Sequence, residues 1–393
     1  MRNRIVITGA GVVSAIGNNK QQCLSSIKKG ITGITEVKYL ETAHHEFPVG
    51  EVKLSNEQMC SDLGVDCLQS RTTLMGIMAV REALQEARLE DGPRRVALIS
   101  GTTVGGMDIT ERVFIAEREN FDASKLDSIH TCGASTNGIA SYFGNMFQST
   151  ITTSTACSSA LNAIIMGCNM IEAGIIDVVV AGGSESLSLF HLNGFKSLMI
   201  LDQNICRPFD ESRSGLNLGE GAAFVVLESE ASAMQRGAKT LASIAGYANS
   251  CDAFHQTATS ADGEGAFLAM THALASAELS PHDIDYINAH GTATPNNDAS
   301  ELRAIQRVFG DNIPPVSSTK SLTGHTTSAS GSIETVISLL ALQEQFVPMN
   351  YNCHTPINGC PAIALTTINA PLKHVMCNSF GFGGNDSSLI ITR

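Results

Sequence analysis

Short apolar runs alternate with longer amphipathic segments along most of the chain. Continuous apolar runs at residues 96–100, 177–181 and 222–227 are typical of strands that are buried on both faces. Over residues 71–89 the apolar positions recur every three or four residues, which indicates an amphipathic helix. Strands and helices in alternation predict an α/β protein in which helices cover a sheet.

The same alternation restarts near residue 240. Further strands are indicated at residues 241–248 and 284–288, and further helices at residues 266–277, 298–309 and 330–342. Each part contains strands, glycine-rich turns and helices in succession. We therefore predict two halves of similar build, residues 1–240 and residues 241–393.

One polar stretch, Thr152–Ala160, contains a single cysteine, Cys157, and is followed by an apolar helical pattern. A cysteine at such a junction lies at the start of a helix, where free backbone N–H groups and the helix dipole favour a thiolate. Taken alone, the stretch fits equally a buried and unreactive cysteine, which is the commoner case. The choice between the two depends on the other polar stretches.

Three further stretches place polar residues or glycine directly after an apolar strand, where α/β proteins build their sites. They are Asn288–Thr294, Ser318–His325 and Asn378–Gly384. Two of them contain a histidine, His290 and His325. A lone histidine is more often a hydrogen-bonded loop residue, and a glycine run alone is an ordinary turn, so only the combination is specific.

Composition and charge narrow the class of protein. The chain has 393 residues, of which 43% are hydrophobic and 16% charged, so it can bury a large core. The net charge of −13 argues against binding to nucleic acid or to an anionic membrane, since both need clustered Lys and Arg. The 11 cysteines are scattered, without Cys-x-x-Cys or zinc-type spacing. We expect a cytoplasmic protein without a metal site.

The N-terminal segment needs a separate interpretation. Residues 5–17 faintly resemble the apolar part of a signal peptide, but glycines and polar residues interrupt the run. Ser14 stands where the third glycine of a dinucleotide-binding fingerprint would be. We therefore expect a strand at residues 4–8, then a glycine-rich turn, and no nucleotide. No stretch has the ~18 uninterrupted apolar residues of a membrane-spanning helix.

In this order the polar stretches resemble the β-ketoacyl-(acyl carrier protein) synthases, the condensing enzymes of fatty acid and polyketide assembly. The likeness runs nearly end to end, from Val6–Gly9 to Asn378–Gly384, and includes Arg207–Asp210 and Leu218–Gly221. The Cys-His-His set is similar to the elongating branch, since the chain-initiating branch has Asn in place of the second His, here His325. The resemblance implies a thiolase-like, five-layered α-β-α-β-α fold with two similar halves, and a dimer.

The resemblance also implies a chemistry, a decarboxylating Claisen condensation. Cys157 would attack an acyl thioester and hold the acyl chain covalently. The backbone N–H groups of Cys157 and Phe382 would form the oxyanion hole. Neutral His290 and His325 would stabilise the enolate that malonyl-(acyl carrier protein) gives on decarboxylation. No metal or organic cofactor is implied, because the thioester supplies its own electron sink and the carrier protein brings the phosphopantetheine.

Further site residues follow from the resemblance alone. Lys320 and Glu334 match an ion pair of the family, although without it they read as an ordinary loop lysine and helix glutamate. The residues that the resemblance implies for substrate binding are Val104 in the acyl pocket, Thr292 and Thr294 at the phosphopantetheine arm, and Phe380 and Phe382 at a glycine-flanked gate. An aliphatic residue at 104 is equally what a plain core would have.

The chain departs from the family pattern at two loops. The last motif usually continues Gly-Gly-Thr-Asn, and here Asn385 and Asp386 follow the glycines. Asn297 stands before Asp298, where glycine is more usual. These departures affect the geometry of the loops and leave the nucleophile in place.

The expected contact with an acyl carrier protein raises a question of charge. Residues 55–70, where the family often has several basic residues, contain no Lys or Arg. The remaining basic candidates are Arg71, Lys125, Arg207 and Arg213. Since carrier proteins are acidic, we expect docking that is weaker, hydrophobic, or shared with a partner subunit. The partner in the dimer is a second copy or a related chain, and the sequence leaves this open.

Three other interpretations remain. A chain-length-determining partner subunit looks like a synthase but lacks the cysteine, so Cys157, His290 and His325 all argue against this interpretation. A thiolase-like acyltransferase acting on coenzyme A esters needs a second reactive cysteine near the glycine loop, and Cys377 is close in sequence. The third is an α/β protein with a structural cysteine, which the four matching stretches disfavour.

Overall fold

The computed structural model describes residues 4–66, 69–90, 94–116, 123–126 and 129–393. Ten strands form one mixed sheet in the order β3-β2-β4-β5-β1-β6-β12-β11-β7-β8, and β9 and β10 form a separate pair. The strands are β1 Ile5–Ser14, β2 Val96–Gly101, β3 Ser149–Thr153, β4 Val178–Glu185, β5 Gly221–Ser229, β6 Ala242–Cys251, β7 Tyr286–Asn288, β8 Val316–Ser317, β9 Phe346–Val347, β10 Ile368–Asn369, β11 His374–Gly381 and β12 Asn385–Thr392.

The two ends of the large sheet repeat one topology. In the first, β2 pairs in parallel with β3 and β4, and β5 pairs antiparallel with β4 and β1. In the second, β7 pairs in parallel with β8 and β11, and β12 pairs antiparallel with β11 and β6. When the five strands of each set are numbered by their order along the chain, they lie side by side in the same sequence: third, second, fourth, fifth, first. The antiparallel contact of β1 with β6 joins them.

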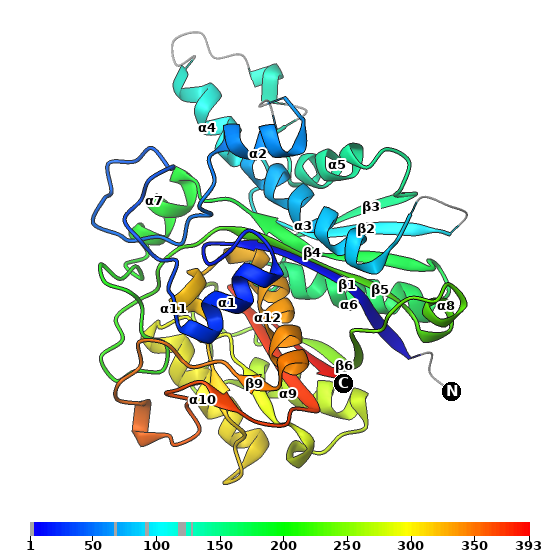
Figure 1. Cartoon of the computed structure of the whole chain (residues 1–393). Coiled ribbons are helices and arrows are strands. Elements are labelled where there is room, and N and C mark those ends of the chain that lie inside the picture. Colours follow the sequence, from blue (N-terminus) through cyan, green and yellow to red (C-terminus); the bar gives the residue numbers. More distant parts are fainter. Residues whose placement is uncertain (1–3, 67–68, 91–93, 117–122, 127–128) are drawn as a thin grey trace.

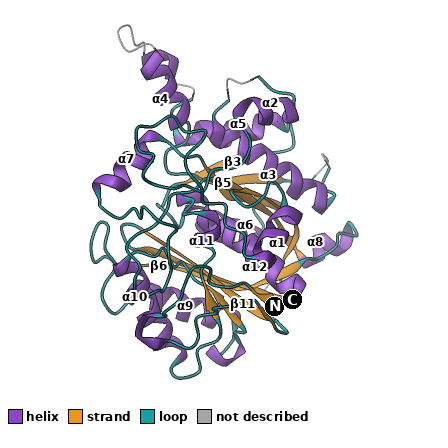
Figure 2. Ribbon diagram, turned by 60° about the vertical axis from the view of Figure 1, so that its left-hand side comes forward, coloured by secondary structure: helices purple, strands orange, loops and turns teal. Residues whose placement is uncertain are grey.

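Helices lie on both outer faces of the strands and between them. The helices are α1 Lys20–Lys29, α2 Asn56–Leu63, α3 Arg71–Ala87, α4 Met107–Ala116, α5 Cys132–Tyr142, α6 Ser159–Glu172, α7 Leu189–Ser197, α8 Glu230–Gln235, α9 Glu264–Ala277, α10 Pro295–Phe309, α11 Lys320–Thr323 and α12 Ser330–Glu344. Helix α3 covers β1, β4 and β5, whereas α9 covers β6 and β12. Helices α6 and α12 pack on each other between the two sets of strands (Figure 1, Figure 2). These are the five layers α-β-α-β-α, as predicted.

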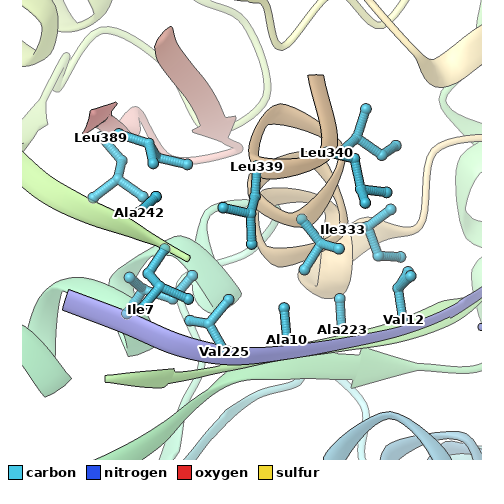
Figure 3. Packing of buried hydrophobic residues seen from close by; sticks show 14 of the residues in the cluster. Ile7, Ala10, Val12, Ala223, Val225, Ala242, Ile333, Leu339, Leu340 and Leu389 are labelled. Carbon is cyan, nitrogen blue, oxygen red and sulfur yellow. The ribbon is translucent and has the colours of Figure 1, made fainter. Parts of the chain in front are cut away.

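The largest hydrophobic cluster fills the space around this central pair of helices. Figure 3 shows Ile333 and Leu339 of α12 between β1 and β5 on one side and Leu389 of β12 on the other. These side chains are at most 1% exposed. Full burial of one such side chain stabilises the fold by roughly 1.5–3 kcal/mol. Helix α12 is buried along most of its length because both of its faces meet strands, and it carries buried polar residues such as Glu334 among the apolar ones.

Two expectations about the strands were wrong. Strand β1 does not end at residue 8 but runs on through Gly9 and Gly11 to Ser14. A Cβ on Gly9 would lie 2.2 Å from the carbonyl oxygen of Ala83, so the glycines allow the close approach of α3 and make no turn. The Asn378–Gly384 stretch does not begin after a strand as expected, since its residues up to Gly381 belong to β11.

In the described part of the chain, no helix is both long and apolar enough to cross a bilayer. The cytoplasmic location stays a prediction. The division into residues 1–240 and 241–393 also stays a prediction, because β1 and β6 join the halves in one sheet.

Candidate active site

Cys157 lies in a tight turn between β3 and α6. The hydroxyl-rich sequence builds this turn: Ser159 Oγ accepts from the Thr155 N–H at 2.9 Å and donates to the Ala156 carbonyl at 2.6 Å. Ala156 has φ of +52°, a left-handed conformation that costs an alanine of order 1 kcal/mol. The turn places Cys157, which is 5% exposed, two residues before the first residue of α6. The predicted helix-start position is therefore observed.

His290 follows β7 at the sharp turn of Gly291. The Glu301 carboxylate of α10 accepts from the N–H groups of His290 and Gly291, at 2.8 Å each, and so fixes the turn. The His290 ring lies edge-on to the His325 ring, with centroids 5.3 Å apart. The Phe380 ring, from β11, lies 5.8 Å from that of His290. Both histidines are buried.

His325 lies between α11 and α12 and is held by a loop from the first half. Its N–H donates to the Asn217 carbonyl at 2.7 Å, and its carbonyl accepts from the Gly219 N–H at 2.9 Å. Its Nδ1 is 2.9 Å from Ser330 Oγ at the start of α12. The Leu218–Gly221 motif thus supports the second histidine.

A buried ion pair lies behind His290. Lys320 Nζ, in a side chain 1% exposed, contacts Glu334 Oε1, the His290 carbonyl and, at 3.3 Å, His290 Nδ1. An ammonium group has three donors and no acceptor. Nδ1 must therefore accept, which leaves the ring proton of neutral His290 on Nε2. The pair fixes the tautomer of the histidine.

Cys157, both histidines and the glycine loop surround one cavity of about 320 Å³. Thr292, Thr294, Phe380 and Phe382 also line it. The threonine hydroxyls are 2.9 Å apart, and the Phe382 ring stacks on that of Phe195 with centroids 6.0 Å apart. Phe382 is 36% exposed, which places it at the solvent end of the cavity.

The electrostatics of the thiol differ from the sequence-based expectation. Burial raises the pKa of Cys157 to about 11, and the Lys320 charge and the backbone N–H groups of Phe382 and Cys157 oppose this rise only in part. The resting residue is a thiol. Backbone N–H groups favour the thiolate as expected, but desolvation outweighs them and the net pKa is raised.

Both histidines are neutral at physiological pH. Burial, followed by the charge of Lys320, lowers the pKa of His290 and of His325 well below 6.5. Each neutral ring offers one N–H donor. Two such donors beside a thiol can stabilise negative charge that develops on a substrate oxygen.

Some predicted residues lie outside the cavity, and some cavity residues were not predicted. Val104 does not line the cavity and its role stays a prediction. Cys377 is fully buried, and its thiol faces Thr335 on α12. Two residues were not predicted: Phe195, which lines the cavity, and Glu301, which fixes the turn at His290. Only an acidic residue on the buried face of the predicted helix 298–309 could have signalled Glu301.

In the described residues, no group of His, Cys, Asp and Glu side chains is arranged to hold a metal ion. Among the ten described cysteines, which exclude Cys67, no two are joined by a disulfide.

Arg71 was wrongly expected as a candidate for carrier docking. Its guanidinium is buried and donates to both carboxylate oxygens of Glu220, at 2.6–2.9 Å. It also donates to the carbonyls of Val52 and Leu54. Arg207 and Arg213 are mostly buried, whereas the side chain of Lys125 lies outside the described part.

Replacing Arg71 with alanine is expected to destabilise the fold by about 3–5 kcal/mol, because it leaves the Glu220 charge buried and unpaired. Denaturant unfolding measures this free energy. Arg303→Ala, at an exposed position of α10, is the matched control and should change it by less than about 0.5 kcal/mol. Equal, small losses for both variants would contradict the structural role of Arg71.

Comparisons with known proteins agree with this site. Residues 2–233 match the family model of the β-ketoacyl synthase N-terminal domain, and residues 241–354 match that of the C-terminal domain. The chain is 34% identical to the 3-oxoacyl-[acyl-carrier-protein] synthase 2 of Vibrio cholerae, over 100% of this chain and 99% of that protein.

Solved structures show the same fold. The ishigamide ketosynthase/chain length factor has a TM-score of 0.91 and 29% identity, covering 100% of this chain and 99% of that one. A ketosynthase in the type II polyketide complex of AntDE with the acyl carrier protein AntF has a TM-score of 0.86 and 27% identity, covering 100% of both chains. The fold, the arrangement of Cys157 with two histidines, and the full-length matches lead to one conclusion. The chain belongs to the β-ketoacyl synthase family.

Proposed function

We propose that this chain is an elongating β-ketoacyl-(acyl carrier protein) synthase. One observation carries the proposal: a buried cysteine and two neutral histidines meet in one cavity with the glycine loop. The neutral histidines suit a reaction that develops negative charge and needs donors more than a strong base. Fatty acid and polyketide assembly both use this reaction, and the acyl chain is not identified by the site.

In the first step, Cys157 sulfur attacks the thioester carbonyl of an acyl carrier. The N–H groups of Cys157 and Phe382 stabilise the oxyanion, the carrier's C–S bond breaks, and the proton of the Cys157 thiol ends on the carrier's phosphopantetheine thiol. Because the resting group is a thiol, proton removal accompanies the attack. Thr292 and Thr294 position the phosphopantetheine arm in the cavity.

In the second step, a malonyl carrier enters and loses its carboxyl group as carbon dioxide. His290 and His325 donate to the enolate oxygen, and the enolate carbon attacks the acyl-Cys157 carbonyl. A carbon–carbon bond forms, the carbon–sulfur bond to Cys157 breaks, and the departing thiolate takes one proton from water. Lys320 and Glu334 position His290, and Phe380 and Phe382 gate the cavity. The proposed reaction needs no resident cofactor.

The curated relative and the solved structures support the partners. Their names refer to an acyl carrier protein and to a chain length factor. We therefore propose acyl- and malonyl-carriers as substrates and a dimer with a second copy or a related chain. Two observations disfavour the alternatives: the reactive cysteine is present, unlike in chain-length-determining partners, and Cys377 does not line the cavity as a thiolase's second cysteine would.

The cavity mouth favours hydrophobic docking of the carrier. Leu198 lines the cavity and is 43% exposed, and the next residue, Met199, is 89% exposed. Apolar side chains of this kind at a cavity mouth are typical of a protein contact.

Met199→Glu is expected to weaken binding of an acyl carrier protein about tenfold, because it adds negative charge and removes apolar area where an acidic carrier docks. Fluorescence anisotropy with a labelled carrier measures the Kd. Met234→Glu, on α8 and 75% exposed, is the matched control. Equal Kd values for both variants, or tight binding that salt weakens steeply, would contradict hydrophobic docking.

The reaction itself is tested with acyl carriers of several chain lengths and a malonyl carrier. The proposal expects β-ketoacyl carrier and carbon dioxide in equal amounts, both absent with Cys157→Ala. Condensation of two acetyl-coenzyme A molecules without decarboxylation would instead identify a thiolase-like enzyme. No product with any carrier, alone or with a related chain, would overturn the proposal.

A further inference from the structure

A buried carboxyl group lies just beyond the glycine loop that carries Phe382. Asp386, near the start of β12, is 2% exposed, and its Oδ1 makes no hydrogen bond within the described residues. Asp252 and Glu301 line the same small internal cavity. This is the position where the family pattern usually has Asn. A neutral side chain has here been replaced by an acid next to two other acids.

The hydrogen bonds indicate which of the three carboxyl groups is best suited to hold a proton. Asp252 accepts from the N–H and the hydroxyl of Ser260, each at 2.7 Å. Glu301 accepts from the N–H groups of His290 and Gly291. Two donors on each favour the ionised form, and at Glu301 burial opposes them and raises the pKa to about 7. Asp386 has no such donor, so it is the member best suited to be neutral.

The charged residues around Asp386 also favour its neutral form. The two helices beside the cavity carry three acidic residues, Glu264 of α9 and Asp298 and Glu301 of α10. Their basic residues are His272, Arg303 and Arg307. Among the described residues no cation forms an ion pair with Asp386: Arg307 is bound to Glu264 at the surface, and Lys320 is bound to Glu334. Burial and the charges of Asp252 and Glu301 raise the pKa of Asp386 to about 8.

This cluster is connected to the catalytic loop through the backbone. The Asp252 N–H donates to the Gly384 carbonyl at 2.8 Å, and the Gly383 N–H donates to the Gln256 carbonyl at 2.8 Å. Gly383 and Gly384 have φ of +84° and +77°, so the loop depends on these bonds and on glycine to keep its shape. A second negative charge beside Asp252 would push apart the two segments that these bonds join.

We propose that Asp386 is a positioning residue that carries a proton and thereby keeps the Gly381–Gly384 loop against the segment that begins at Asp252. In its protonated form the carboxyl adds no charge beside the Asp252 carboxylate in the shared cavity, and its deprotonation releases the loop. This inference depends on the proposed function at one point. Phe382, which lies in this loop, supplies an oxyanion donor beside Cys157. The enzyme therefore loses loop order as the pH rises.

The sign of the stability effect follows from proton counting. With its pKa raised from 3.8 to about 8, Asp386 holds a proton in the folded chain that the unfolded chain releases. Stability therefore falls as the pH rises between about 4 and about 8. Asp386→Asn keeps the shape and a donor without the titration. The Tm difference between Asp386→Asn and the wild type should grow from near zero at low pH to at least about 2 °C above pH 8.

The test measures Tm and self-acylation of the full chain across this pH range. The acylation rate of Asp386→Asn relative to the wild type should rise at least about fivefold from pH 6 to pH 9, since the ratio removes the titration of Cys157 that both share. Asp311→Asn, exposed after α10, should change neither the Tm difference nor the rate ratio. Asp386→Ser, which keeps only a hydroxyl, should show the same growing Tm difference even if the asparagine variant folds poorly.

A Tm difference and a rate ratio that are both independent of pH would overturn the inference, since a merely structural aspartate would behave in that way. The Tm measurement needs no substrate. If the wild type fails to acylate at all, the proposed function fails, and the pH dependence of Tm still decides the role of Asp386.

Discussion

Replacing His290 or His325 with alanine is expected to lower condensation by about 10²–10³-fold, the usual effect of removing one donor from an oxyanion site. Each ring is neutral and offers one N–H. The two rings lie edge-on to each other, with centroids 5.3 Å apart. Acyl transfer to Cys157 should be affected less, because its oxyanion is stabilised by backbone N–H groups. Release of carbon dioxide from the malonyl carrier and the acylated fraction of the enzyme measure the two steps separately.

His272→Ala is the matched control, since this histidine is exposed on α9. It should condense at the wild-type rate. Decarboxylation that survives unchanged in either active-site variant would refute the role given to the histidines. Because the pKa values of both rings lie well below 6.5, wild-type condensation should show no loss from histidine protonation as the pH falls from 8 to 6.

Lys320→Met is expected to have the second large effect, on both stability and activity. It leaves the Glu334 carboxylate buried without its cation, which costs about 3–5 kcal/mol. It also frees His290 Nδ1, so that the ring is no longer held with its proton on Nε2. Denaturant unfolding and the condensation rate measure the two losses.

The double variant Lys320→Met/Glu334→Leu separates the two losses. Removing both charges should recover most of the lost stability, since apolar replacements of a buried ion pair are often nearly neutral. Condensation should stay at least about tenfold below the wild type, because the tautomer of His290 is still not fixed. Recovery of both stability and condensation would show that the pair is only structural.

The layered fold could be predicted from the apolar pattern because buried strands and helices with apolar faces have distinct periods. Helix 71–89 was observed as Arg71–Ala87, and helix 330–342 as Ser330–Glu344. The extension of β1 through Gly9 and Gly11 could not be predicted. Glycine in a strand and glycine in a turn look the same in a sequence, and only the contact with Ala83 on α3 distinguishes them.

The candidate catalytic side chains could be identified by likeness of motifs, whereas their charge states could not. Cys157 has the predicted place before a helix, but burial raises its pKa. It lines one cavity with both histidines and residues 381–384, which come from distant segments. The burial of Arg71 could not be predicted for the same reason. Its local sequence looked like that of a surface residue, whereas its buried partner, Glu220, is 149 residues away. Local sequence patterns do not predict burial or pKa values that depend on contacts between distant segments.

The central claim is that Cys157 carries the acyl chain. The most direct test is the intact mass of the enzyme after incubation with acyl carriers, followed by peptide mapping of the modified residue. We predict one acyl group on Cys157, which is lost in Cys157→Ala and retained in Cys377→Ala, a matched buried cysteine. An acyl group on Cys377, or acylation that survives in Cys157→Ala, would contradict the account.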